Sequence, residues 1–166
     1  MVDTSVARQQ LGATTLNRKW FLDVNTGTDA APVWVGVFGM QEFKPNTTGT
    51  FEDTSDFASG WKGSQKTAME WSVEGKVKRA STAATATTYD PGQEYLRTKS
   101  LLMGVAGRIS VRFYEMEPSG PRIQAYQGFC SVDWTEEGGD MSKLSVASFK
   151  LSGDGQLASI THPATP

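Results

Sequence analysis

Residues 67–79 read TAMEWSVEGKVKR, and this stretch decides the fold class because its side chains alternate strictly between apolar and polar. One face would carry Met69, Trp71, Val73 and Val77, and the other Glu70, Ser72, Glu74, Lys76 and Lys78. A period of two over this length is typical of a long strand with one buried and one wet face. The stretch therefore predicts an antiparallel β protein.

Strand signals continue on both sides of this stretch. Residues 17–24 (NRKWFLDV) and 32–40 (PVWVGVFGM) are rich in β-formers and are separated by turn-forming residues, which predicts a hairpin. Residues 108–116, 122–134 and 142–151 predict three further strands. In residues 142–151 the apolar side chains switch from even-numbered positions (Leu144, Val146) to odd-numbered ones (Phe149, Leu151), which suggests a bulge near Ala147.

One helix is expected between these two groups of strands, at about residues 91–103. Asp90 is a good N-cap, Pro91 suits the first helical position, and Gln93 could complete a capping box. Gly104 supplies a stop signal. Leu96, Leu102 and Met103 would form the stripe that packs on a sheet. The fold class is therefore mainly β, an antiparallel β-sandwich or barrel-like domain with one flanking α-helix.

Residues 41–63 (QEFKPNTTGTFEDTSDFASGWKG) predict a connection that is unusually long for a compact domain. It contains Phe43, Phe51, Phe57 and Trp61, which a disordered linker usually lacks. We interpret it as a long loop whose aromatic side chains pack on something, such as another copy of the protein. Residues 1–166 are expected to form a single domain with an N-terminal arm at about 1–16 and a C-terminal tail at about 153–166.

Composition and charge restrict the possible functions. The 166 residues carry a net charge of −2 and the pI is about 5.4, which argues against tight nucleic-acid binding but not against DNA sliding past. Cys130 is the single cysteine, so no intrachain disulfide can form. No signal peptide or membrane span is evident, so we expect synthesis in a cytoplasm and no membrane partner.

Catalytic and metal-binding signals are weak. His162 is the single histidine, which leaves little basis for a triad or a histidine metal site. Ser59 and Lys62 match S-x-x-K without the supporting motifs of an acyl-transfer enzyme. Glu52, Asp53 and Asp56 do not follow an EF-hand pattern. We therefore expect no catalytic residues, metal or cofactor, and a protein that is not an enzyme.

The layout of the motifs resembles a known family. Residues 20–27 (WFLDVNTG) end the first strand, residues 34–39 (WVGVFG) lie in the second, and the long connection contains EDTSD at 52–56 followed by Gly60 and Trp61. A Trp-bearing strand, a single helix and residues 126–132 (YQGFCSV) complete the layout. Together these resemble the major tail tube proteins of long-tailed, siphovirus-like bacteriophages. The tube proteins of contractile tails and of type VI secretion are related alternatives.

The resemblance implies a structural subunit of a virion tail, made in a bacterial host. Six copies would form a ring, and stacked rings would form a tube whose inner wall is a continuous β-barrel. DNA would pass through the lumen without specific binding. The implied partners are further copies of the chain, with tail terminator, tape measure and distal tail proteins.

Two sets of surface residues are candidates for assembly contacts. Candidate contacts between rings or subunits are Phe51, Glu52, Asp53, Asp56, Phe57 and Trp61. For Trp61, packing back on its own domain is the alternative. Candidates for a lumen or subunit surface are Glu70, Ser72 and Glu74, for which a solvent-facing strand face is the alternative. Lys76 and Lys78 on the same face argue against the lumen. Two other functions stay open: a monomeric binding module, for example for carbohydrate, that uses loop aromatics, and a small hydrolase.

Overall fold

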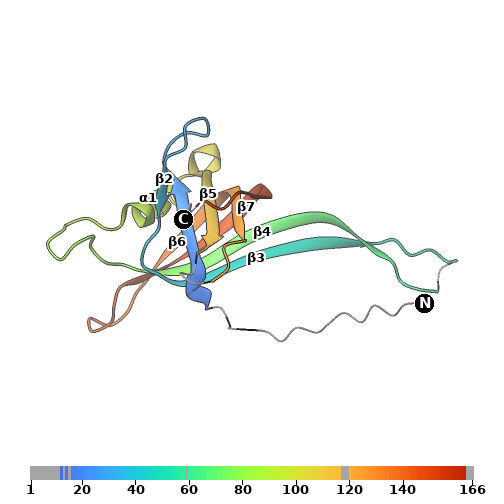
Figure 1. Ribbon diagram of the computed structural model, residues 1–166, viewed down its shortest axis with the longest axis horizontal. Coiled ribbons are helices and arrows are strands. Elements are labelled where there is room, and N and C mark those ends of the chain that lie inside the picture. The colour runs from blue at the N-terminus through green and yellow to red at the C-terminus, as the bar shows by residue number, and fades with distance from the viewer. Residues whose placement is uncertain (1–11, 13, 15, 59, 117–119, 164–166) are drawn as a thin grey trace.

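The computed structural model describes residues 12, 14, 16–58, 60–116 and 120–163 (Figure 1). Its strands are β1 (Trp20–Asn25), β2 (Trp34–Gly36), β3 (Met40–Asp53), β4 (Ser64–Lys78), β5 (Ile109–Glu115), β6 (Ala125–Glu137) and β7 (Val146–Ser159). Its helices are α1 (Pro91–Lys99) and the 3₁₀ turns η1 (Asn17–Lys19) and η2 (Gly104–Gly107). Within the described residues no helix has both the length and the apolar character that a membrane span requires.

The strands form one antiparallel sheet in the order β2-β1-β5-β6-β7-β4-β3. The predicted mainly β class with one flanking α-helix is confirmed, although the sheet does not close into a barrel. It curves so strongly that the rings of Trp20 in β1 and Phe43 in β3 stack with their centroids 5.8 Å apart. Strands at opposite ends of the sheet order therefore share one core.

Phe113 of β5 lies at the centre of that core, with 1% of its surface exposed. Its ring lies 5.6–6.3 Å from the rings of Trp20, Phe43, Trp71 and Tyr126, each from a different strand. Aromatic pairs at such distances add to the stabilisation that burial gives. The expected core face of β4 is confirmed for Trp71, Val73 and Val77 but not for Met69, which is exposed.

Helix α1 begins as predicted and ends earlier. The Asp90 carboxylate accepts a hydrogen bond from the Gln93 backbone N–H at 3.0 Å. The Gln93 side chain does not form the predicted capping box, because its amide donates to the carbonyls of Phe38 and Lys78 instead. The helix ends at Lys99, where Ser100 N–H bonds to Leu96 and the following N–H groups make tighter bonds. Residues 100–103 are therefore not helical, contrary to the predicted range.

Arg79 connects the end of β4 to the helix and to β6. Its side chain is only 5% exposed, and its guanidinium lies 2.6 Å from Glu94 and 3.4 Å from Glu136. The same group lies over the rings of Tyr89 and Trp134. A buried guanidinium with this many partners fixes the position of α1 relative to the sheet.

The predicted long loop at 41–63 is mostly a strand. Residues 41–53 belong to β3, which pairs with β4 as far as Asp53↔Ser64, and only residues 54–63 connect the two strands. Pro45 lies within β3, and this is compatible with a strand because β3 is at the edge of the sheet. The polar sequence hid the strand because most of its residues are exposed on both faces.

Two other expectations near the C-terminus are wrong. The β6–β7 register is regular around Ala147, and its irregularity lies between Gln127 and Phe129, opposite residues 154–158. Leu144 precedes β7 and is exposed, which explains the apparent change of parity. β7 also runs to Ser159, into the range predicted as a C-terminal tail. The predicted arm at 1–16 falls almost entirely outside the described residues.

Glu115 holds together the chain segments where β5 ends. Its carboxylate accepts hydrogen bonds from the backbone N–H groups of Ile123 and Gln124, both at 2.9 Å, and pairs with Lys19 at 3.0 Å. Burial acts to raise the pKa of Glu115, but these hydrogen bonds and the Lys19 charge outweigh it and hold the pKa below its usual range. Folding therefore favours the ionised carboxylate.

We expect Glu115→Gln to lower the free energy of unfolding by about 1–2 kcal/mol at pH 7, because a charged acceptor of three hydrogen bonds is lost. The contribution of a lowered pKa is present above the unfolded value of about 4.3 and is lost as pH falls through the folded pKa. Urea unfolding from pH 7 to pH 2.5 should therefore show the two proteins converging at low pH. A difference that stays constant over this range would contradict the assignment.

Candidate functional site

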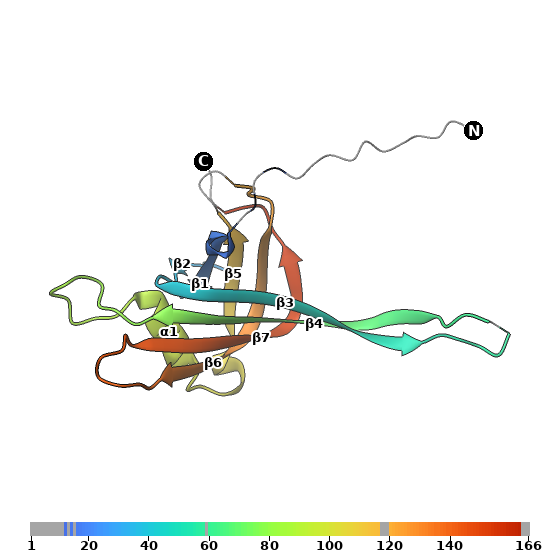
Figure 2. The ribbon, with the colours of Figure 1, turned by 90° about the horizontal axis from the view of Figure 1, so that it is seen from below.

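The β3–β4 hairpin extends far beyond the body of the protein (Figures 1 and 2). β4 pairs with β7 only from Lys78↔Val146 to Ser72↔Ser152. Beyond that point, and within the part of the chain that the structure describes, residues 47–53 and 64–71 pair only with each other. We call these two segments the ribbon and residues 54–63 its tip.

The ribbon buries almost nothing in the isolated chain. Every residue from 64 to 70 is exposed, and on β3 only Gly49 is partly covered between residues 47 and 53. Phe51 and Met69 are 60% and 64% exposed. A two-stranded hairpin without a hydrophobic face to pack on is only marginally stable in water. The ribbon is therefore suited to pack against another surface.

The tip is organised by short-range hydrogen bonds. Thr54 N–H donates to the Gly63 carbonyl at 3.1 Å, and Gly63 N–H donates to the Ser55 hydroxyl at 2.9 Å. The carboxylates of Asp53 and Asp56 accept from the backbone N–H groups two residues later, at 2.8 and 2.9 Å. Hydrogen bonds from Ser55 lower the pKa of Asp53. These carboxylates therefore shape the turn.

The six predicted contact residues all lie at the distal end of this hairpin, but in two kinds of structure. Phe51, Glu52 and Asp53 are on β3, whereas Asp56, Phe57 and Trp61 are in the tip. Phe57 is fully exposed and Trp61 is 88% exposed. The Lys66 ammonium lies 5.6 Å from the Phe51 ring centroid, across the ribbon. The hairpin thus presents aromatic side chains at its far end.

Trp71 fixes the point where the ribbon leaves the body. Its indole lies against Gly128 of β6 and Gly153 of β7, where a Cβ atom would come within 2.6 Å and 2.4 Å of the indole ring. Its Nε1–H donates to the Gly155 carbonyl at 3.1 Å. The side chain is 5% exposed, and the next residues toward the tip are exposed. Trp71 is therefore the anchor at the base of the ribbon.

The predicted lumen or subunit residues lie together on the polar face of the sheet. Glu70, Ser72 and Glu74 line one depression of about 340 Å³. Asn46 and Thr48 of β3 and Lys150 of β7 line the same depression. Glu70 belongs to the ribbon, whereas Ser72 and Glu74 belong to the four-stranded part of the sheet.

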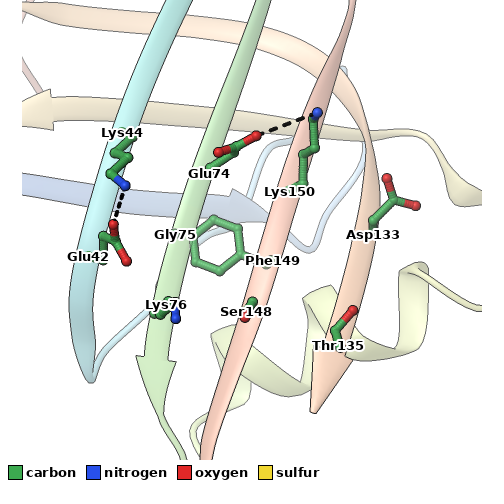
Figure 3. Close-up of a pocket in the computed structure, with 10 residues that line it drawn as sticks. All are labelled: Glu42, Lys44, Glu74, Gly75, Lys76, Asp133, Thr135, Ser148, Phe149 and Lys150. Atoms are coloured by element: carbon green, nitrogen blue, oxygen red, sulfur yellow. Dashed lines mark ion pairs between the residues drawn. The ribbon is translucent and has the colours of Figure 1, made fainter. Parts of the chain in front are cut away.

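A second depression, of about 260 Å³, continues this face toward β6 (Figure 3). Glu74 lies 3.5 Å from Lys150, Lys76 lies 3.0 Å from Glu137, and Lys44 pairs with Glu42. The hydrogen bond and charge of Lys44 lower the pKa of Glu42. The face is therefore strongly polar, with charges of both signs in close pairs.

An exposed apolar turn after α1 was missed. Leu101, Leu102, Met103 and Val105 are 75%, 45%, 91% and 88% exposed. The sequence analysis placed Leu102 and Met103 in the packed stripe of a longer helix. Gly104 was used as the stop signal of a helix that reaches residue 103, but with its positive φ of 62° it follows this turn and not the helix. It lies only four residues after Ser100, where the helical bonds already tighten.

The Cys130 thiol is buried in the core of the protein. Burial raises the pKa of the Cys130 thiol to about 12, so it is protonated at neutral pH and unreactive. The described residues contain no group of three or more His, Cys, Asp or Glu side chains placed to hold a metal ion. Ser59, of the S-x-x-K match, lies outside the described residues.

Several solved structures share this fold. A chain in the tail of an empty gene transfer agent (GTA) particle, determined with C6 symmetry, matches with a TM-score of 0.65 and 12% identity over 89% of this chain and 100% of that one. A chain of the SPP1 tail tube matches with a TM-score of 0.64 and 11% identity over 88% of this chain and 78% of that one. A chain of the 6-fold symmetrised baseplate of the anti-feeding prophage (AFP) matches with a TM-score of 0.60 and 5% identity over 93% and 100%.

No protein-family model matches the sequence, and no curated protein matches it. At identities this low, the structural matches establish the fold. The protein has the tail tube fold, as the SPP1 tail tube does, and the fold expected from the resemblance is confirmed.

We expect removal of the Trp71 side chain at the base of the ribbon and of the Phe57 side chain in its tip to have very different effects on the stability of the protein. Trp71→Ala should lower the free energy of unfolding by about 3–5 kcal/mol, because a buried indole is removed from its seat on two glycines. Phe57→Ala should change it by less than about 0.5 kcal/mol, because the ring is fully exposed. Thermal or urea unfolding of the two variants checks this. A comparable loss for Phe57→Ala would show that the tip packs within its own subunit.

Proposed function

We propose that the protein is a non-enzymatic structural subunit of a phage or phage-like tail tube, located in the tail of the particle. The observation that carries the proposal is the tail tube fold combined with a ribbon that, beyond its anchor Trp71, is almost entirely exposed in the part of the chain that the structure describes. Six copies form a ring, as the C6 symmetry of the similar GTA tail suggests. The whole chain acts as one domain in this assembly.

Ring closure follows from two free strand edges. Among the described residues β3 pairs with a strand on one side only, and residues 131–137 of β6 pair with no strand other than β7, although α1 also contacts β6. The unit β6-β7-β4-β3 has an even number of antiparallel strands, so its two edge strands run in opposite directions. The β3 edge of one copy therefore meets the β6 edge of the next in antiparallel pairing, and repetition closes a ring.

Rings then stack through the ribbon and its tip. The ribbon gains the apolar packing that it lacks alone when it lies on the adjacent ring. Phe51, Phe57 and Trp61 supply the aromatic contacts, and aromatic side chains are enriched at such interfaces. Glu52, Asp53 and Asp56 complete the polar rim of this contact.

The polar face that contains Glu70, Ser72 and Glu74 lines the lumen, through which DNA passes without specific binding. A wall with balanced charges avoids the strong phosphate binding that unpaired lysines would cause. Copies of the same chain are the main partners. Terminator, tape measure and distal tail proteins bind the ends or the inside of the tube.

A monomeric binding module is the second candidate function, since Phe57 and Trp61 are exposed as in a carbohydrate-binding surface. The length of the unsupported ribbon favours assembly over this alternative. A binding module would stay monomeric at high concentration and would keep a folded tip in isolation.

Electron microscopy of the purified protein over a range of concentrations tests the proposal. Rings with six-fold symmetry or straight hollow tubes are expected. Particles that remain monomeric at millimolar concentration would contradict it.

The role of the tip is tested by replacing residues 54–63 with Asn-Gly, a sequence suited to the tight turn that would join the paired residues Asp53 and Ser64. The variant should fold and form rings but no longer stack into tubes. A Phe57→Ser/Trp61→Ser double variant separates the aromatic contact from the reach of the hairpin, and should also fail to stack. Ala58→Ser in the same tip is the control and should form tubes. Tubes of normal length from the shortened variant would remove the tip from the stacking contact.

A further inference from the structure

The charges on the polar face follow the strand register. Lys44 of β3 lies opposite Glu74 of β4, Glu74 lies opposite Lys150 of β7, and Lys150 lies opposite Asp133 of β6. These four residues form one row across the sheet in which positive and negative charges alternate (Figure 3). The row is set by backbone pairing, so it does not depend on the conformation of any one side chain.

The two ends of the row lie on the two free strand edges. Lys44 is on the unpaired edge of β3, and Asp133 is in the segment of β6 whose only strand partner among the described residues is β7. The row therefore ends in a positive charge on one edge and a negative charge on the other. The edges are complementary in charge as well as antiparallel in direction.

We propose that Lys44 of one copy pairs with Asp133 of the next copy and sets the register of the joint between subunits. This inference rests on the proposed ring and adds the register to it. Opposite charges directly across two antiparallel strands stabilise a pairing, and like charges destabilise it. Continued around the ring, the row becomes a closed circle of alternating charge.

Neighbouring residues favour this register over its two nearest alternatives. Those are shifts by two residues, which keep the same side chains on the polar face. With Lys44 opposite Asp133, antiparallel pairing places Glu42 opposite Thr135. A shift of two residues in one direction places Glu42 opposite Glu137, and the opposite shift places it opposite Asp133. Both alternatives bring two carboxylates face to face.

The apolar face agrees with the same register. Phe43 and Trp134 lie opposite each other across the joint, and so do Pro45 and Val132. Phe43 and Val132 are buried in the core of their own subunit and Trp134 is half-buried, so the joint extends an apolar layer that already exists. The joint is thus apolar on one side and charge-paired on the other.

Charge reversal tests the pairing. Lys44→Glu places two carboxylates opposite each other at the joint, and Asp133→Lys places two ammonium groups there. Each should raise the protein concentration for half-maximal ring formation by about tenfold or more at low salt. The double variant Lys44→Glu/Asp133→Lys should restore ring formation to near the wild-type concentration. Lys143→Glu, a charge reversal at an exposed lysine in the turn between β6 and β7, is the control and should leave ring formation close to wild type.

A mixing experiment separates contact between copies from contact within one copy. A ring that alternates Lys44→Glu and Asp133→Lys subunits has two kinds of joint, and neither kind brings like charges together. 

At one joint the introduced glutamate faces the introduced lysine, and at the next joint the native Lys44 faces the native Asp133, so every joint in this ring brings opposite charges together. An equimolar mixture of the two impaired proteins should therefore form rings at concentrations where neither does alone, as measured by sedimentation velocity and electron microscopy. Unfolding of each monomer, followed by circular dichroism, checks that the variants are folded.

The outcomes distinguish this inference from the proposed function. Wild-type rings with no effect of either reversal, or with no rescue by the double variant and the mixture, would overturn the Lys44–Asp133 pairing and leave the tube subunit standing. A wild-type protein that forms no rings would overturn the proposed function itself.

Discussion

The seat of Trp71 on Gly128 and Gly153 is the constraint on which the rest of the structure depends. The indole occupies the space of two missing side chains on β6 and β7 and joins the aromatic cluster around Phe113. β4 is therefore held in the body up to this residue and is unsupported beyond it. This contact thus divides one hairpin into two parts: an edge of the β6-β7-β4-β3 part of the sheet and an exposed ribbon. A larger residue at either glycine would displace the indole and change where they separate.

The parts of the fold that the sequence predicted are those with one dry and one wet face. Trp71, Val73 and Val77 alternate with polar residues because only one side of β4 meets the core. Residues 41–53 gave no such pattern, since most of that strand is wet on both faces, and its threonines, proline and glycine are typical of a loop. A strand that is exposed on both faces need not show a period of two in its sequence. The tip aromatics Phe57 and Trp61 could be singled out from the sequence because they are large apolar residues in an otherwise polar stretch.

The arrangement of charges on the polar face could not be predicted from the sequence alone. Lys44, Glu74, Asp133 and Lys150 are far apart along the chain, and their row exists only after the register of four strands is fixed. Lysines on the same face as Glu74 argue less strongly against a lumen role once Lys44, Lys76 and Lys150 are each seen beside a carboxylate. A phosphate approaching this face meets alternating charges and not a basic patch.

Pro45 has a consequence for the behaviour of the subunit before assembly. A bare strand edge of this length is a template for indiscriminate sheet growth, and a residue without an N–H interrupts that template near its middle. A strand that approaches this edge therefore cannot form a complete ladder of backbone hydrogen bonds with it. In the proposed tube, association between free subunits would be slowed, while a partner held in place by an existing end could still add. Growth of the polymer would thus depend on a seed, with a lag that the seed abolishes and a threshold concentration below which the protein stays in solution.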